Sequence, residues 1–329
     1  MPSVMGVIAV RFHGRADVPK LKVGASVWTV ESDRTLLDSL LDVGLAVPFS
    51  CRAGSCHACL VRCLEGHVAD AQPEALPPER RAEGWRLACQ CRIVGDVRVS
   101  IFNPEEDGIP ATLMAVDWLG ADVVRLRMQP ERSVRYRPGQ SVVLWLNGIA
   151  RSYSIASLPG EAPWLEFHID CSRPGQFSTA ARVIKPGDQL CLGALNGSAL
   201  HYPAEQPDSP LLLLGSGSGL APLWGILREA LDQEHAGPIT VVHRAREASG
   251  HYLRPALDRL AAEQSALNVE YLDEKGWEPW LKTLRLSSRR TVALACGSPA
   301  FVEAVSRRLF MAGLPRGQLL TETFVSKAL

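Results

Sequence analysis

The sequence of 329 residues lacks an excess of charge of either sign, since 35 basic residues balance 35 acidic ones. Proteins that bind nucleic acid or anionic membranes usually carry a strongly basic patch, so we expect neither partner. The sequence also lacks any apolar run near the roughly twenty residues that span a bilayer. Residues 1–10 contain neither a basic leader nor a cleavage site of small residues. We therefore expect a soluble, cytoplasmic protein without a signal peptide.

Motifs of the common hydrolases are also missing. The sequence contains no evident Ser-His-Asp order, H-E-x-x-H helix or paired-carboxylate motif. Cysteine, by contrast, is plentiful, with nine in the chain. In a reducing cytoplasm these side chains stay as thiols or bind metal. Their spacing is therefore the most informative signal in the sequence.

Four of the cysteines follow the C-x4-C-x2-C…C spacing of a plant-type 2Fe-2S ferredoxin: Cys51, Cys56, Cys59 and Cys89. Four thiolates can bind two irons if one tight loop supplies three sulfurs and a distant segment supplies the fourth. Gly54 allows such a loop to wrap closely, so that backbone N–H groups point at the sulfurs and stabilise the charge of the cluster. The spacing therefore predicts single-electron transfer.

Other interpretations of these cysteines fit less well. Zinc usually takes two matched Cys pairs or Cys with His, and disulfides need an oxidising compartment. A Rieske centre needs two Cys-His pairs, and we expect His57 to be an exposed loop residue instead. The spacing and the Leu-Ala-Cys-Gln segment favour Cys89 over Cys91 as the fourth ligand, and leave Cys63 outside the set.

The length suggests two or three domains. Residues 21–30 alternate as a short hairpin, and residues 35–43 form an expected helix with Asp33 as its cap. Residues 1–17 are undecided between an added strand at 7–12 and an arm. The polar run 103–110 predicts a linker.

The pattern of elements changes twice after this linker. Strand-like segments at 112–118, 123–128, 141–146, 164–170 and 189–192, punctuated by Pro and Gly, favour an antiparallel barrel. After residue 210, expected strands at 211–214, 239–242, 267–272 and 291–295 alternate with helices at 220–231, 253–262 and 300–311. Such alternation predicts a parallel sheet covered by helices.

Two further motifs accompany these segments. In the barrel, Arg151-Ser152-Tyr153-Ser154 would present a cation, an aromatic face and a small hydroxyl along one strand, as a flavin requires, although such a strand can also be an exposed rung of a barrel. In the α/β part, a buried strand runs into a Gly-rich turn and then a helix, which suits a pyrophosphate; its residues are Gly215, Gly217, Ser218 and Gly219.

Together these motifs resemble a family of bacterial oxygenase reductases, those of benzoate dioxygenase, phenol hydroxylase and soluble methane monooxygenase. The resemblance implies a multidomain fold: an α+β β-grasp 2Fe-2S ferredoxin domain (1–103), an antiparallel β-barrel FAD domain (109–207) and an α/β parallel-sheet nicotinamide domain (208–329). It implies that hydride passes from NAD(P)H to FAD, and that electrons leave singly through the cluster to a redox partner.

The resemblance also implies roles for individual residues. Arg151 would bind the flavin phosphate, Tyr153 would pack on the isoalloxazine, and Ser154 would hydrogen-bond near the hydride-accepting atom. Gly175 and Ser178 resemble a second phosphate loop, while Cys296-Gly297 resembles the turn beside the nicotinamide. Cys296 would contact the flavin–nicotinamide pair there and, with Ser154, would be a catalytic residue; the alternative for Cys296 is a small buried apolar residue. Ser152, within the same motif, is also expected to bind the cofactor, and Phe324 is expected to contact the flavin ring. Residues 192–197 depart from the family's Gly-Pro-x-Gly turn.

Donor and acceptor stay open at this stage. Arg244 or Arg246 would favour NADPH and Glu247 would favour NADH; the resemblance favours NADH. The acceptor expected first is an oxygenase component. A dehydratase of deoxysugar synthesis is the alternative acceptor, and a redox sensor without turnover is an alternative of another class.

Overall fold

The computed structural model describes residues 18–197 and 199–325, so the strand considered at 7–12 lies outside the described residues. The contacts divide the chain into two units. Unit 1 comprises the described part of Met1–Val47 together with Val61–Ile101. Unit 2 comprises Pro48–Leu60 and Phe102–Leu329 up to the last described residue. The three sheets have five, six and five strands.

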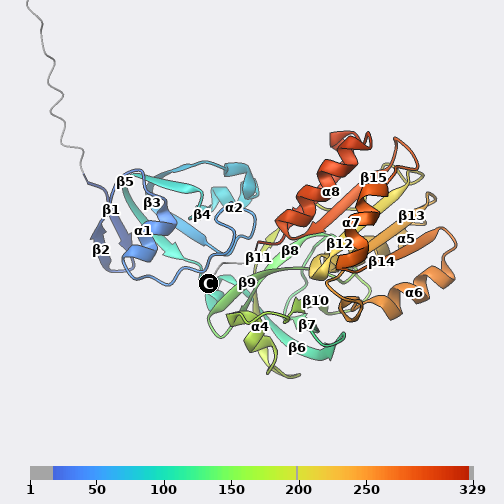
Figure 1. Ribbon diagram of the computed structural model, residues 1–329. Helices are drawn as coiled ribbons and strands as arrows, with labels where there is room; N and C mark the ends of the chain where they lie inside the picture. Colours follow the sequence, from blue (N-terminus) through green and yellow to red (C-terminus); the bar gives the residue numbers. More distant parts are fainter. Residues whose placement is uncertain (1–17, 198, 326–329) are drawn as a thin grey trace, which may run out of the picture. The chain divides into compact units, whose positions relative to one another are not determined.

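Unit 1 contains the first sheet, in the order β2-β1-β5-β3-β4 (Figure 1, blue to cyan). Strand β1 pairs antiparallel with β2 and parallel with β5, and β3 pairs antiparallel with β5. This mixed sheet with one main helix is the expected β-grasp arrangement. Its elements are β1 (Lys20–Val23), β2 (Ser26–Thr29), α1 (Leu36–Asp42), β3 (Leu60–Asp70), a 3-10 helix (Pro73–Ala75), α2 (Pro78–Ala82), β4 (Trp85–Leu87) and β5 (Cys91–Ile101).

The local sequence explains the start of this unit, with one correction. The hairpin turns at Gly24, whose φ of 58° is readily adopted by glycine. Helix α1 forms where expected, but Asp33 is not its cap. Thr35 is the N-cap, and its Oγ1 accepts a hydrogen bond from the N–H of Asp38 at 3.1 Å. Asp33 lies two residues earlier, in a turn where its N–H donates to the carbonyl of Ile93.

The second sheet closes into the predicted antiparallel barrel. Its order is β10-β7-β6-β11-β8-β9, and a bridge between Ile155 and Phe167 joins its two outer edges. The N–H of Ala156 also donates to the carbonyl of Glu166 at 2.8 Å. The strands are β6 (Ile109–Trp118), β7 (Val123–Pro130), β8 (Ser141–Leu146), β9 (Ile149–Ser154), β10 (Leu165–Asp170) and β11 (Gln189–Asn196).

The run expected as a linker is partly structured. Residues Pro104–Asp107 form the short helix α3, and the Oδ1 of Asn103 accepts from the N–H of Glu105 at 3.2 Å. Strand β6 already begins at Ile109. The prediction missed this because a cluster of Pro, Glu and Asp is as typical of a capped helix start as of a linker.

The third sheet is parallel, in the order β14-β13-β12-β15-β16 (Figure 1, yellow to red). Its strands are β12 (Leu211–Ser216), β13 (Ile239–Arg244), β14 (Leu267–Leu272), β15 (Val292–Gly297) and β16 (Leu319–Thr323). The helices of unit 2 are α4 (Gln176–Ala181), α5 (Leu220–Asp232), α6 (Arg254–Glu263), α7 (Glu274–Thr283) and α8 (Pro299–Met311), with 3-10 turns at Gly217–Gly219, Ala248–Gly250 and Arg316–Gln318.

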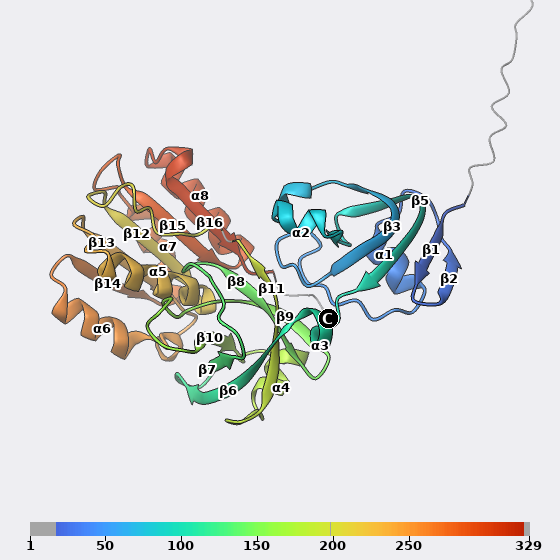
Figure 2. The same cartoon turned by 180° about the vertical axis from the view of Figure 1, so that it is seen from behind.

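Helices cover both faces of this sheet, and successive side chains of strand β12 point to opposite faces. Leu211 and Leu213 pack with residues of α5 and α6 in one core cluster. Leu212 and Leu214 pack with residues of α7 and α8 in another. Because side chains alternate between faces with a period of two, the run of four leucines serves helices on both sides. Figure 2 shows the same sheet from behind.

One helix that covers this sheet, α7, and one of its strands, β16, were not predicted. Helix α7 contains Pro279 and Gly276, which ordinarily argue against a helix. It forms because Trp277 and Leu281 are buried against the sheet and the Asp273 Oδ1 accepts from the N–H of Gly276 at 2.8 Å. Strand β16 was also missed.

Among the described residues, no helix is both long enough and apolar enough to cross a membrane.

The corrected cap gives a test of the fold. Thr35→Ala should lower the free energy of unfolding by about 1 kcal/mol because the N–H of Asp38 loses its acceptor. Asp33→Gly is the matched control, because glycine adopts the positive φ of residue 33 (68°) without strain, and it should change the free energy of unfolding by less than half as much. Urea denaturation of the two variants measures the difference, and a larger loss for Asp33→Gly would restore Asp33 as the cap.

Candidate iron-sulfur, flavin and nicotinamide sites

The loop with three of the predicted iron ligands belongs to unit 2. It wraps tightly, because Arg52, Gly54 and His57 all have positive φ angles. The N–H groups of Ala53 and Cys56 each donate to the Sγ of Cys51 at 3.3 Å. The side chain of Cys56 is the strongest influence on Cys51, and with these N–H groups it lowers the pKa of Cys51 to about 4 despite burial. The hydrogen bond between these two side chains, followed by burial, raises the pKa of Cys56, so Cys51 is the thiolate of this pair.

The fourth predicted ligand lies in unit 1, in the turn between β4 and β5. The side-chain amide of Gln90 donates to the Sγ of Cys89 at 3.3 Å. Cys91 differs, since burial, followed by the negative charge of Asp70, raises its pKa to about 12. Burial likewise raises the pKa of Cys63. The choice of Cys89 over Cys91 rests on its spacing from Cys59 and on the Leu-Ala-Cys-Gln segment, and the ligand set stays a prediction.

The described residues contain no group of three or more His, Cys, Asp or Glu side chains placed to bind one metal ion. A 2Fe-2S cluster does not require such a group, because its four thiolates are shared between two irons.

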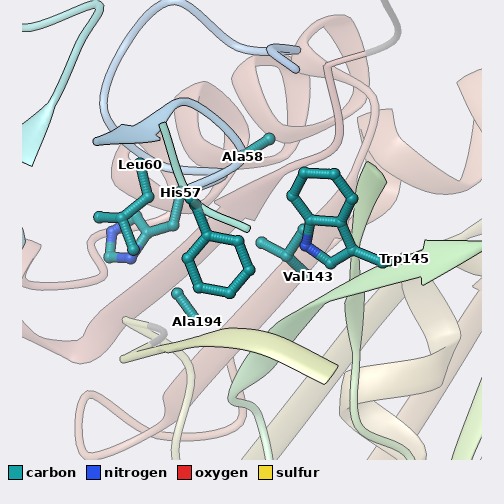
Figure 3. Close-up of a pocket in the computed structure, with 7 residues that line it drawn as sticks. His57, Ala58, Leu60, Val143, Trp145 and Ala194 are labelled. Atoms are coloured by element: carbon teal, nitrogen blue, oxygen red, sulfur yellow. The ribbon is translucent and has the colours of Figure 1, made fainter. Parts of the chain in front are cut away.

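His57 is not the exposed loop residue that we expected. Its side chain is only 3% exposed, and it lines a small hollow with Phe102 and Trp145 (Figure 3). The rings of Phe102 and Trp145 stack at 5.6 Å between centroids and 19° between planes. The side-chain amide of Asn196 also donates to the carbonyl of Ser55. The prediction failed because these contacts join segments far apart in the sequence.

The Arg151–Ser154 motif lies on β9, where it was expected to present flavin-binding groups. Ser154 is 5% exposed and its Oγ has no hydrogen-bond partner among the described residues. Tyr153 packs against Phe177, with 4.9 Å between ring centroids, and burial raises its pKa, so it stays neutral. A buried hydroxyl without a partner costs about 1–3 kcal/mol, so Ser154 suits a ligand that supplies the missing hydrogen bond.

The remaining flavin candidates surround this strand. The Arg151 Nη1 donates to the carbonyl of Ala150 at 2.8 Å, and the Ser152 Oγ donates to the Ser141 Oγ at 3.3 Å. The Ser178 Oγ donates to the carbonyls of Arg173 and Gly175 at 3.0 and 3.2 Å. The hydroxyl of Ser178 therefore stabilises its own turn, and a role of residues 175–178 in phosphate binding stays a prediction.

The nicotinamide candidates meet at the carboxyl ends of the parallel strands. Gly219 lies against the carbonyl of Cys296, where any Cβ would collide with the backbone of Cys296 and Gly297. The N–H of Phe324 donates to the carbonyl of Gly297 at 2.8 Å. The structure therefore brings the Gly-rich turn, the Cys296-Gly297 turn and Phe324 together. Ligands of parallel sheets bind at this edge.

The side chain of Cys296 is fully buried in the core cluster of α5 and α6. Burial raises its pKa well above the usual value for a thiol. It therefore contributes a neutral, apolar group beneath the turn, and its contact with the nicotinamide stays a prediction.

The donor-specificity residues have different surroundings. The guanidinium of Arg244 lies over the ring of Trp277 at 5.6 Å, and its Nη1 lies 3.5 Å from the Ser216 Oγ. Arg246 and Glu247 are both exposed, and the Arg246 Nη2 lies 3.4 Å from the Ser172 Oγ. The guanidinium of Arg244 therefore makes more contacts with the protein than that of exposed Arg246. The preference for NADH or NADPH stays a prediction.

Known families match both ends of this arrangement. The 2Fe-2S iron-sulfur cluster binding domain matches residues 23–94, and the oxidoreductase NAD-binding domain matches residues 213–307. The reductase component of the naphthalene 1,2-dioxygenase/salicylate 5-hydroxylase systems of a Ralstonia species is 30% identical over 314 residues, covering 89% of this chain and 94% of that protein. The chain belongs to this family of ferredoxin–NAD(P)+ reductases.

Other relatives and solved structures agree with this assignment. Reductase component 2 of terephthalate 1,2-dioxygenase from a Comamonas species is 32% identical over 294 residues, covering 83% of this chain and 86% of that protein. An Amycolatopsis cytochrome P450 reductase of known structure has a TM-score of 0.63 and 26% identity, and covers 93% of this chain and 98% of its own.

Membership confirms the fold class, the cofactors and the type of enzyme that the sequence predicts. The chain is an NAD(P)H-dependent flavin iron-sulfur oxidoreductase with a 2Fe-2S cluster and FAD. It transfers electrons from NAD(P)H to a redox partner. The cysteine loop, the hydroxyl of Ser154 and the close approach at Gly219 fit these three groups.

The ligand choice can be tested directly. Cys89→Ser should abolish the low-temperature electron paramagnetic resonance signal of the reduced cluster, whereas flavin bleaching by NADH should persist. Cys91→Ser is the matched control and should retain both, because Cys91 lies outside the C-x4-C-x2-C…C spacing. A full cluster in Cys89→Ser, with loss in Cys91→Ser, would reverse the assignment.

A second test concerns the hydroxyl of Ser154. Ser154→Ala should slow flavin reduction by about tenfold, the effect of losing one hydrogen bond near the reacting atoms, without lowering the stability of the flavin-free protein. Ser209→Ala is the control, since the Ser209 Oγ is also buried without a partner but belongs to another region. Stopped-flow absorbance measures both rates, and equal rates for Ser154→Ala and wild type would contradict the role.

Proposed function

We propose that this reductase delivers single electrons to an oxygenase component and prefers NADH to NADPH as its donor. The supporting observation is the Ralstonia relative, which is a component of a dioxygenase and hydroxylase system and aligns with 89% of this chain. The Comamonas relative belongs to a dioxygenase system as well. The preference for NADH follows the sequence resemblance alone.

Specific residues would bind the flavin and the cluster. When bound, FAD supplies the conversion between a two-electron hydride and single electrons. Arg151 would offer a cation to its phosphate, Tyr153 a half-buried ring, and Ser154 a hydroxyl with unused hydrogen-bonding capacity. Ser152, Gly175 and Ser178 would complete the phosphate contacts. The irons would be bound by Cys51, Cys56, Cys59 and Cys89.

The nicotinamide would bind at the carboxyl edge of the parallel sheet. The backbone of the Gly-rich turn would bind the pyrophosphate, through residues Gly215, Gly217, Ser218 and Gly219. Cys296 and Gly297 would lie beneath the reacting ring, and Phe324 would cover the flavin. The thiol of Cys296 is buried in the core of the sheet, so it would support this turn from beneath.

The domains that we propose differ from the two units that the contacts define. We propose a ferredoxin domain over residues 1–103, an FAD domain over 109–207 and a nicotinamide domain over 208–329. Each proposed domain contains one sheet and one set of cofactor residues. A cytoplasmic location agrees with reduced cysteines.

A second acceptor has a specific observation in its favour. A CDP-6-deoxy-L-threo-D-glycero-4-hexulose-3-dehydrase reductase of Yersinia pestis is 25% identical over 326 residues, covering 93% of this chain and 98% of that protein. Its identity is lower than that of the oxygenase reductases, although its coverage is higher. We therefore place a deoxysugar dehydratase second. A sensor without turnover has no comparable support, because the chain belongs to a family of reductases.

An anaerobic titration with NADH and with NADPH tests the electron path and the donor. Visible absorbance and electron paramagnetic resonance should show flavin bleaching and a reduced 2Fe-2S signal, with a higher kcat/KM for NADH. Slow reduction by both donors would revive the sensor. A cluster that stays oxidised while the flavin is reduced would contradict electron transfer through it.

The acceptor needs its own assay. The reduced protein should be mixed with the oxygenase components of an aromatic-ring dioxygenase, or with a deoxysugar dehydratase, and the oxidation of its cluster followed. Faster oxidation by the oxygenase component supports the proposal. Faster oxidation by the dehydratase would replace the proposed acceptor with the second one.

A further inference from the structure

A pair of buried histidines lies directly behind the Gly-rich turn. His243 is on β13, opposite Gly215 in the parallel register, and it is fully buried. Its Nε2 lies 3.1 Å from the carbonyl oxygen of Gly217, and its Nδ1 lies 3.2 Å from the Nδ1 of His251. No motif in the sequence pointed to either histidine.

These contacts fix the positions of the protons. A carbonyl oxygen only accepts hydrogen bonds, so His243 must donate from Nε2. Burial, followed by the neighbouring His251, lowers the pKa of His243 to about 3, so the ring is neutral near pH 7 and its Nδ1 is an acceptor. His251 must therefore donate from its own Nδ1. One arrangement of protons satisfies both hydrogen bonds.

The hydrogen bond to Gly217 also determines the direction of the next N–H group. In a trans peptide the C=O of one residue and the N–H of the next point in opposite directions, and the described residues contain no cis peptide. The carbonyl of Gly217 also accepts from the N–H of Leu220. With this carbonyl turned towards the ring of His243 as well, the N–H of Ser218 points away from that ring. Backbone N–H groups at a strand-to-helix turn bind phosphate groups.

The ring of His243 is also restrained from the barrel side. Tyr252, which is buried, meets His243 edge to face at 5.7 Å and 88°. Its hydroxyl lies 3.3 Å from the Nδ1 of His168, whose Nε2 lies 3.0 Å from the Glu166 Oε1. A carboxylate only accepts, so His168 donates to Glu166 from Nε2, and the Tyr252 hydroxyl lies within hydrogen-bonding distance of its other ring nitrogen.

This chain of contacts ends at Glu166, whose carboxyl group is held in its ionised form. Burial alone would raise its pKa, but the hydrogen bond from His168 and the positive charge beside it, including Arg125, outweigh burial and lower it to about 2. The Arg127 Nε donates to the Glu166 Oε2 at 3.3 Å. The chain of contacts therefore connects strand β10 of the barrel with the Gly-rich turn.

We propose that His243 is a positioning residue for the dinucleotide: it fixes the carbonyl of Gly217 so that the N–H of Ser218 faces the pyrophosphate, and His251 fixes its tautomer. The inference rests on the proposed role of residues 215–219 in binding the donor. His243 would contact the Gly-rich turn on the side away from the ligand, and it would not contact the reacting atoms.

The test compares His243→Asn with His243→Gln in the FAD-loaded, full-length protein. The amide nitrogen of Gln reaches about as far as the imidazole Nε2, whereas that of Asn reaches only the Nδ1 position. The two probes are NADH, in stopped-flow flavin reduction, and ADP-ribose, as a competitive inhibitor that has the pyrophosphate without the nicotinamide. Flavin occupancy and melting temperature are measured on the same samples.

His243→Asn should weaken the binding of both NADH and ADP-ribose by about tenfold, and the limiting rate of flavin reduction at saturating NADH should not change. His243→Gln should recover most of the affinity. Wild-type affinity in His243→Asn, or the same loss in both variants, would overturn the positioning role. A wild-type protein that does not bind ADP-ribose would instead refute the proposed pyrophosphate turn itself.

A second variant applies if His243→Asn does not fold. His251→Leu leaves His243 in place but removes the donor that selects its tautomer. It should weaken ADP-ribose binding by about threefold, a smaller effect than direct loss of the bond. Unchanged ADP-ribose affinity in a folded His251→Leu protein would overturn the role of the histidine pair.

Discussion

The close approach of Gly219 to the carbonyl of Cys296 is the constraint on which the nicotinamide half depends. Because a Cβ at Gly219 would meet backbone on the neighbouring strand, the start of α5 can lie directly on the end of β15. That contact places the Gly-rich turn, the Cys296-Gly297 turn and Phe324 at one edge. Without it, the same motifs would lie on neighbouring strands but would not form one surface.

A similar dependence on backbone geometry appears in the cysteine loop. Three residues with positive φ angles turn the chain tightly enough for two N–H groups to reach the Sγ of Cys51. In both places the binding site depends on backbone N–H and C=O groups. The residue types of the loop determine where these groups lie. This division explains why short glycine-containing motifs carry so much of the functional signal.

The sequence predicted those features whose physical cause is local. The spacing of Cys51, Cys56 and Cys59, the alternation of the barrel strands and the run of four leucines before Gly215 each identify an element without reference to distant residues. Helix α7 could not be predicted in this way, because burial of Trp277 compensates for Pro279 and Gly276. The cap of α1 required a choice between two nearby residues that both suit the position.

Contacts between distant segments account for the rest. His57 appeared exposed because the loop sequence is polar, and its burial depends on Phe102 and Trp145, which follow it by many residues. His243 lies in a plain strand, and only the fold shows that its Nε2 meets Gly217. Both residues are histidines, whose buried and exposed forms look alike in a sequence.

The unpartnered hydroxyl of Ser154 has a consequence for the life of the protein in the cell. A ligand that satisfies this group binds the folded chain and not the unfolded one, so stability rises with the ratio of free ligand to its dissociation constant. Chains that acquire flavin are then the ones that persist, while chains without it unfold more often and are exposed to proteolysis. The supply of flavin would thus set how much of the reductase accumulates.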